Sequence, residues 1–241
     1  MSLEPVQLVG GTGSPYTQKM VALLRYRRIP YAITWGQPEV LCAALGVEAP
    51  KPTFMPTFFF DDGGKLTAHC DSTPIIRRLE ADHIGRSVLP KDPALAFIDY
   101  LIEDFADEWC TKYMFHYRWH FAADADNAGT KLPLSMDVSM PQEADWVAVE
   151  DQPASLSGLL EEIGRVYSPA QLANAQAVMA QNKTWECEID GARWHQRTFP
   201  YQAKCLQWTR DQYRQLSPAD QARVDAVIAG TGIELMLEGA A

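Results

Sequence analysis

The chain lacks several features that mark whole classes of protein. None of its apolar runs approaches the roughly twenty residues that a membrane-spanning helix needs, and its first residues lack the basic-then-apolar pattern of a signal peptide. Basic residues are in deficit, because 21 lysines and arginines stand against 31 aspartates and glutamates, a net charge of −10. This balance opposes electrostatic binding to nucleic acid or to anionic lipid. We therefore expect a cytoplasmic protein that binds neither nucleic acid nor a membrane.

Motifs for disulfides, nucleotides and metals are also missing. The five cysteines form no C-x-x-C pair and no cluster with metal-ligand spacing, which is typical of reduced thiols. The glycine-rich residues 10–13 lack both the Lys-Ser/Thr ending of a Walker phosphate loop and the spacing of a dinucleotide fingerprint. His116 and His120 have the i, i+4 spacing of metal ligands, but Tyr117 stands where the H-E-x-x-H motif has its glutamate, and no third ligand is evident. We expect neither a bound nucleotide nor a metal.

The most informative feature that is present is a strand, a tight turn and a helix start near the N-terminus. A short apolar run at residues 6–9 precedes Gly-Gly-Thr-Gly-Ser-Pro-Tyr-Thr, after which apolar residues recur at helical spacing. Ser14 fits the N-cap and Pro15 the first helical position. Because a helix N-terminus favours a bound anion or a nucleophile in its charged form, Ser14 is a candidate active-site residue. The alternative is a helix cap without chemistry.

Two further segments have a similar character. Residues 54–60 form an apolar, strand-like run entered through Pro56, and residues 65–68 are expected to return as the second strand of a hairpin. Directly afterwards, Asp71 and Ser72 precede apolar residues at helical spacing, which predicts another capped helix start. In chain order, the expected elements are a strand, a helix, a strand at residues 31–35, a short helix around residues 40–45, a hairpin and a helix. This is a compact α/β plan.

The order of these elements and the three motifs resemble the thioredoxin-like N-terminal domain of the glutathione transferase superfamily, over roughly the first third of the chain. The resemblance implies that Ser14 lies beside the sulfur of glutathione. It also implies a cis peptide bond before Pro56, with Met55 offering only its backbone N–H and C=O to the cysteinyl part of glutathione. Asp71 would bind the γ-glutamyl ammonium group and Ser72 the carboxylate. Taken singly, Pro56 could equally be a strand-entry proline, and Asp71 and Ser72 a simple helix cap.

The first helix start also limits the chemistry. Some members of the superfamily carry Cys-Pro-Tyr-Cys at this place, whereas this chain has Ser14 and Thr17, so a dithiol redox cycle at the motif is excluded. A cysteine thiol has a pKa of about 8.5 in water, and a helix end with a hydroxyl donor raises its thiolate fraction. A thiol tripeptide needs a sheet edge, a helix N-terminus and an acid for its amine, and the sequence supplies all three.

The second half of the chain predicts a mostly helical domain. Breakers and charges at residues 85–93 indicate a linker, and apolar residues then keep a helical rhythm over residues 95–114. We expect a thioredoxin-like domain at residues 1–84 and a helical domain at residues 94–241, an α/β fold followed by an all-α one. A possible β-hairpin at residues 185–196, around an Asp-Gly turn, is unusual for the helical domain of the superfamily.

Other parts of the second half predict helices less uniformly. Ser168-Pro169 and Ser217-Pro218 read as caps of later helices. Residues 122–154 have three prolines and weak periodicity where the superfamily has regular helices, and its Ser/Thr-x-x-Asp cap is not recognisable. An aromatic cluster within residues 109–121 fits either a substrate pocket or the core.

The resemblance implies an enzyme that uses glutathione as a cosubstrate, without a metal. Ser14 would stabilise the thiolate, which is transferred to an electrophilic small molecule or used to reduce a peroxide or a disulfide. The alternative is a non-catalytic protein that keeps the fold for binding or as a scaffold, with Ser14 only as a cap. A homodimer is implied by the resemblance alone.

Overall fold

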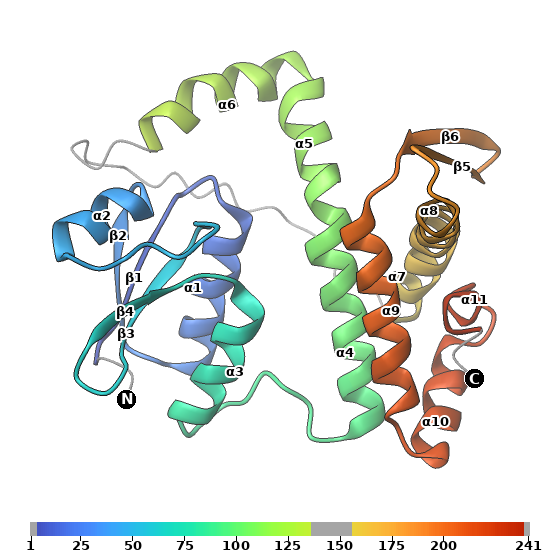
Figure 1. Ribbon diagram of the computed structural model, residues 1–241, viewed down its shortest axis with the longest axis horizontal. Coiled ribbons are helices and arrows are strands. Elements are labelled where there is room, and N and C mark those ends of the chain that lie inside the picture. Colours follow the sequence, from blue (N-terminus) through green and yellow to red (C-terminus); the bar gives the residue numbers. More distant parts are fainter. Residues whose placement is uncertain (1–3, 136–155, 239–241) are drawn as a thin grey trace. The chain divides into compact units, whose positions relative to one another are not determined.

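The computed structural model describes residues 4–135 and 156–238, which form two compact units (Figure 1). The first unit holds the chain up to Leu89 together with the helical segment that begins at Phe115. The second unit holds the chain from Pro90 to Met114 and the described residues from Leu156 onward. The expected domain limits at residues 84 and 94 stay a prediction. A mixed α/β region followed by mainly helical elements confirms the predicted fold class.

A four-stranded mixed sheet is the centre of the first unit. Its strands, in the order β2-β1-β3-β4, are β2 (Tyr31–Trp35), β1 (Val6–Gly10), β3 (Thr57–Asp61) and β4 (Leu66–His69). Strands β1 and β2 are parallel, whereas β3 is antiparallel to both β1 and β4. The strand predicted at residues 31–35 and the predicted hairpin are confirmed, although the first strand of the hairpin begins at Thr57 rather than at residue 54.

Helices cover both faces of this sheet (Figure 1). Helices α1 (Pro15–Arg27) and α3 (Ser72–Asp82) pack on the face that carries Val6, Leu8, Phe58 and Phe60. Helix α2 (Pro38–Leu45) packs on the opposite face, against Val9 and Phe59. Because side chains alternate along a strand, the run Phe58-Phe59-Phe60 fills both cores, and all three rings are at most 2% exposed.

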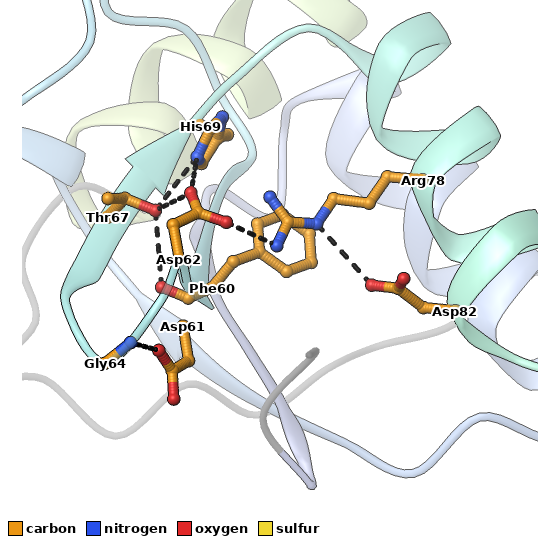
Figure 2. A network of polar contacts seen from close by, with 8 residues as sticks. All are labelled: Phe60, Asp61, Asp62, Gly64, Thr67, His69, Arg78 and Asp82. Carbon is orange, nitrogen blue, oxygen red and sulfur yellow. Dashed lines mark hydrogen bonds and ion pairs between the residues drawn. The ribbon is translucent and has the colours of Figure 1, made fainter.

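A network of polar contacts joins the β3–β4 hairpin to α3 (Figure 2). The carboxylate of Asp62 accepts hydrogen bonds from Arg78 at 2.7 Å and from Thr67 at 2.5 Å, and His69 Nε2 lies 3.0 Å away. These contacts, chiefly the one from Arg78, hold the pKa of Asp62 well below its usual range. The Arg78 guanidinium also lies 3.9 Å from the centre of the Phe60 ring. The network therefore fixes the hairpin against α3, the helix whose first residues include two of the predicted site residues.

Helical residues run without interruption from Pro93 to His120. The run comprises α4 (Pro93–Phe105), the π-helix η1 (Ala106–Cys110) and α5 (Thr111–His120). This confirms the helix expected over residues 95–114, apart from its π-helical turn. The weakly periodic stretch 122–154 nevertheless begins with helix α6 (Ala122–Ser135), in keeping with its several alanines. Residues 136–155 lie outside the described part of the chain.

The second unit is a helical assembly with one hairpin. Besides α4 and η1, it contains α7 (Leu156–Glu162), the π-helix η2 (Ile163–Tyr167), α8 (Ser168–Met179), β5 (Thr184–Ile189), β6 (Ala192–Arg197), α9 (Pro200–Arg214), α10 (Pro218–Ile228) and α11 (Glu234–Leu237). The predicted hairpin is confirmed: Asp190 and Gly191 have φ values of 54° and 72°, as a two-residue turn between antiparallel strands requires.

One of the two helix caps expected in this unit is correct. Ser217 caps α10 and accepts a hydrogen bond from the backbone N of Asp220 at 3.2 Å. The cap predicted at Ser168 is wrong, because Tyr167 before it is already helical and the helix continues from η2 into α8. Ser168 Oγ is buried and has no hydrogen-bond partner among the described residues. A helix that enters from the preceding turn leaves no free end to cap.

A partly buried acid adjoins the core of the second unit. Asp104 on α4 accepts a hydrogen bond from the Tyr167 hydroxyl, which in turn accepts one from Gln171 Nε2 at 2.7 Å. Burial raises the pKa of Asp104 to about 6, against the lowering effect of the Tyr167 hydrogen bond. The neighbouring carboxylates Glu103 and Asp107 add to the rise. Ionised Asp104 is therefore a cost to the folded state.

We expect Asp104→Asn to remove a pH dependence of stability. Since the folded state holds its proton up to about pH 6 and the unfolded state only to about pH 4, the free energy of unfolding falls as pH rises between these values. The contribution of Asp104 to this loss is about 2 kcal/mol over the range in the wild type and is absent in the variant, which keeps an acceptor for Tyr167. Urea unfolding at both ends of this range measures it. Equal pH dependence in both proteins would contradict the assignment.

Gly164 provides a second stability test, because a Cβ at this position of η2 would overlap the backbone carbonyl of Thr231. We expect Gly164→Ala to lower the free energy of unfolding by about 2 kcal/mol or more, since backbone cannot move aside as a side chain does. Gly129→Ala on α6 is the control, as a Cβ there meets no atom within 4 Å. If Gly164→Ala unfolded at the same urea concentration as the wild type, η2 and the backbone of Thr231 would not be in contact.

Candidate functional site

Three segments that are distant in sequence meet at one end of the four-stranded sheet. Val9, near the carboxyl end of β1, pairs with Thr57 at the start of β3. Phe58 pairs in turn with His69 at the end of β4. The turn that follows β1, the loop that precedes β3 and the N-terminus of α3 therefore leave the sheet at the same end. These are the three segments that carry the predicted site residues.

Ser14 occupies the N-cap of α1. Its backbone is extended, with φ −89° and ψ 116°, and its half-buried Oγ accepts a hydrogen bond from the backbone N of Thr17 at 3.2 Å. Pro15 takes the first helical position, as predicted. A serine hydroxyl has one proton to donate and two lone pairs. Capping uses one lone pair, so the proton remains for a ligand at the helix end.

The turn that carries Ser14 is held by its own hydrogen bonds. The backbone N of Ser14 donates to the carbonyl of Gly11 at 3.0 Å, and Gln18 Nε2 reaches back to the carbonyl of Thr12 at 3.0 Å. Gly11 lies against the next segment, because a Cβ added there would be 3.1 Å from Met55 Sδ. The absence of a side chain at Gly11 thus allows the turn to approach the loop before β3.

Met55 and Pro56 form that loop. The peptide bond between them is cis, as the resemblance implies, and Pro56 is buried while Met55 is half-buried. No hydrogen bond from another described residue reaches the backbone N–H or C=O of Met55. A peptide laid along this segment would find both groups available for pairing, as in the addition of a strand to a sheet edge.

Asp71 and Ser72 begin α3. Asp71 is the N-cap, exposed, and its Oδ1 accepts a hydrogen bond from the backbone N of Thr73 at 3.3 Å. Its backbone has φ 79° and ψ 116°, a combination that L-residues rarely adopt and that often marks a binding site. Ser72 is buried at the first helical position. A carboxylate and a hydroxyl therefore lie side by side at a helix N-terminus.

A further residue of the site was missed by the sequence reasoning. Lys19, on α1, donates a hydrogen bond from Nζ to Ser72 Oγ at 3.3 Å. This contact places a cation beside the hydroxyl that the resemblance assigns to a carboxylate. Nothing local distinguishes Lys19 from an ordinary surface lysine, because its partner is 53 residues away. It also ties α1 to the start of α3, so that two of the three segments are joined directly.

The structure also places the aromatic cluster of residues 109–121 and the histidine pair within it. Trp109, from the aromatic cluster, is 1% exposed and belongs to the core of the second unit, whereas Phe115, Tyr117, Trp119 and Phe121 are exposed. The rings of His116 and His120 are stacked 4.5 Å apart. Within residues 4–135 and 156–238, no three acidic, histidine or cysteine side chains are grouped so as to hold a metal.

Among the described residues, no helix is both long and apolar enough to cross a bilayer.

Comparison with known proteins identifies one family. Residues 8–87 match the sequence model of the family described as the glutathione S-transferase N-terminal domain, about a third of the chain. The match covers all three segments of the candidate site. Comparisons with curated proteins and with solved structures gave no match.

The backbone of Asp71 predicts an unusual stability effect. Asp71→Gly should raise the free energy of unfolding by up to about 1 kcal/mol, because glycine adopts a positive φ without strain and loses little as an N-cap. Asp71→Ala keeps the strain and loses the cap, so it should lower the same quantity by about 1 kcal/mol. Thermal and urea unfolding measure both. A glycine variant less stable than the alanine variant would show that the wild-type backbone is unstrained.

Proposed function

The N-terminal domain of this chain belongs to the glutathione S-transferase superfamily, and from that premise we propose that the protein binds glutathione and stabilises its thiolate through Ser14. The observation that carries the proposal is the convergence of the Ser14 turn, the Met55–Pro56 loop and the start of α3 at one end of the sheet. Each segment offers a group that suits one part of the tripeptide.

The γ-glutamyl end of glutathione would bind at the start of α3. The exposed carboxylate of Asp71 suits the ammonium group, since capping Thr73 leaves other lone pairs free. Ser72 and the positive end of the α3 dipole suit the carboxylate, and Lys19 adds a full charge there. The cysteinyl part would pair with the backbone of Met55, which directs the sulfur toward the turn after β1.

At that turn, the Ser14 hydroxyl and the N-terminus of α1 would favour the thiolate. In water only a few per cent of a thiol with a pKa of about 8.5 is ionised at neutral pH. A hydrogen bond from Ser14 and the helix dipole stabilise the negative charge and lower that pKa. The sulfur then attacks an electrophilic carbon: an S–C bond forms, and the leaving group departs with the electron pair of the bond that breaks.

Conjugation to a small electrophile is the reaction we favour, and reduction of a peroxide or a disulfide by glutathione is the other use of the same thiolate. A cytoplasmic homodimer is part of the proposal, on the analogy of the superfamily alone. A second candidate is a non-catalytic binding or scaffold protein. It is favoured by the use of Ser14 Oγ as the α1 cap, which alone accounts for a serine at this position.

The test is retention on immobilised glutathione, followed by conjugation of an aryl halide by the wild type, Ser14→Ala and Ser14→Thr. We expect the wild type to bind and turn over, and Ser14→Ala to bind but lose about 100-fold in kcat, since a donor to the reacting atom is removed. Ser14→Thr keeps both the hydroxyl and the cap, so it controls for loss of the helix cap.

The outcomes separate the two candidates. Retention of the wild type without turnover supports the scaffold. A Ser14→Ala variant as active as the wild type would remove Ser14 from the mechanism. A wild type that glutathione does not retain would overturn the proposed function altogether.

A further inference from the structure

We propose that Arg118, on α5, is a positioning residue for Ser14: it holds the peptide that joins Gly13 to Ser14 by a hydrogen bond to the carbonyl of Gly13. This inference rests on the proposed function. Arg118 lies far from the matched family domain in sequence, and it is half-buried. Its Nη2 donates a hydrogen bond to the carbonyl oxygen of Gly13 at 3.0 Å, across 105 residues of chain.

The contact completes the hydrogen bonding of the turn. The backbone N of Ser14 already donates to Gly11, and the carbonyl of Thr12 accepts from Gln18 on α1. The carbonyl of Gly13 is the remaining acceptor between Gly11 and Ser14. Arg118 takes it, so the peptide that joins Gly13 to Ser14 is held at both its N–H and its C=O. Because both its N–H and its C=O are hydrogen-bonded, this peptide resists rotation. The position of the Ser14 Cα, from which the side chain extends, is therefore fixed.

A second contact joins the same part of the chain to the turn. A Cβ added at Gly13 would overlap Leu132 Cδ2, on helix α6. Arg118 and Leu132 both lie in the segment beginning at Phe115, which belongs to the same compact unit as Ser14. The side chains of Arg118 and Leu132 thus both contact Gly13. They can approach this closely because Gly13 has no side chain of its own.

The guanidinium suits this task because a charged donor makes a stronger hydrogen bond than a neutral one. Arg118 contacts the peptide next to Ser14 rather than Ser14 Oγ, so it is not a catalytic residue. Its effect on the reaction should pass through the position of the Ser14 hydroxyl, and that distinguishes it from a residue that only supports the fold.

The experiment compares Arg118→Ala, Arg118→Lys and the control Arg77→Ala, an exposed arginine on α3. Removing a charge-assisted hydrogen bond should lower kcat for aryl halide conjugation about tenfold or more in Arg118→Ala. Glutathione affinity should stay within about twofold, because Arg118 touches none of the groups proposed to bind it. The ultraviolet absorption of the bound thiolate should fall in parallel with kcat. Arg118→Lys, which keeps a charged donor, should recover part of both, and Arg77→Ala should match the wild type.

The double variant Ser14→Ala/Arg118→Ala decides whether the effect passes through Ser14. If it does, the double variant is no slower than Ser14→Ala alone. Losses that multiply, or a wild-type kcat in Arg118→Ala, would overturn the inference.

Amide hydrogen exchange separates this inference from the proposed function. Exchange at residues 11–17 should be faster in Arg118→Ala than in Arg77→Ala or the wild type. If the wild type fails to bind glutathione or to turn over, the proposed function falls by itself. Unchanged exchange in Arg118→Ala overturns the role of Arg118, whatever the activity.

Discussion

The antiparallel pairing of β3 with both β1 and β4 is the constraint on which the candidate site depends. It brings the end of one strand beside the start of the next, so that a turn, a loop and a helix start share one end of the sheet. The buried run Phe58-Phe59-Phe60 holds β3 in register, because a shift by one residue would exchange the rings between two different cores. Packing of the sheet and geometry of the site therefore have the same origin.

Much of this arrangement could be predicted because its signals are local. The helix starts at Ser14 and Ser217 and the hairpin turn at Asp190 depend on a few adjacent residues, and the structure has all three. The cap at Ser168 failed because tertiary packing continues one helix into the next. The π-helical turns have no comparable sequence signal.

The side chains that contact the site residues could not be predicted from local sequence patterns. Lys19 and Ser72 are 53 residues apart, and Arg118 and Gly13 are 105 apart. Neither contact follows from spacing or composition, since each exists only once elements distant in sequence have packed together. The candidate position Ser14 was visible in the sequence, whereas the side chains that surround it were not. This difference is general for sites built on a local turn and completed by distant elements.

The uninterrupted helical run from Pro93 to His120 has a consequence for how this protein can be divided. Its first part belongs to one compact unit and its last part to the other, so the border between them lies inside a helix. A fragment cut at the expected linker would keep the whole sheet but lose Arg118 and Leu132, and with them the outer support of Gly13. A chimera that joins this N-terminal segment to the C-terminal part of a related protein would also lack these contacts to Gly13, unless the related protein supplied an equivalent arginine.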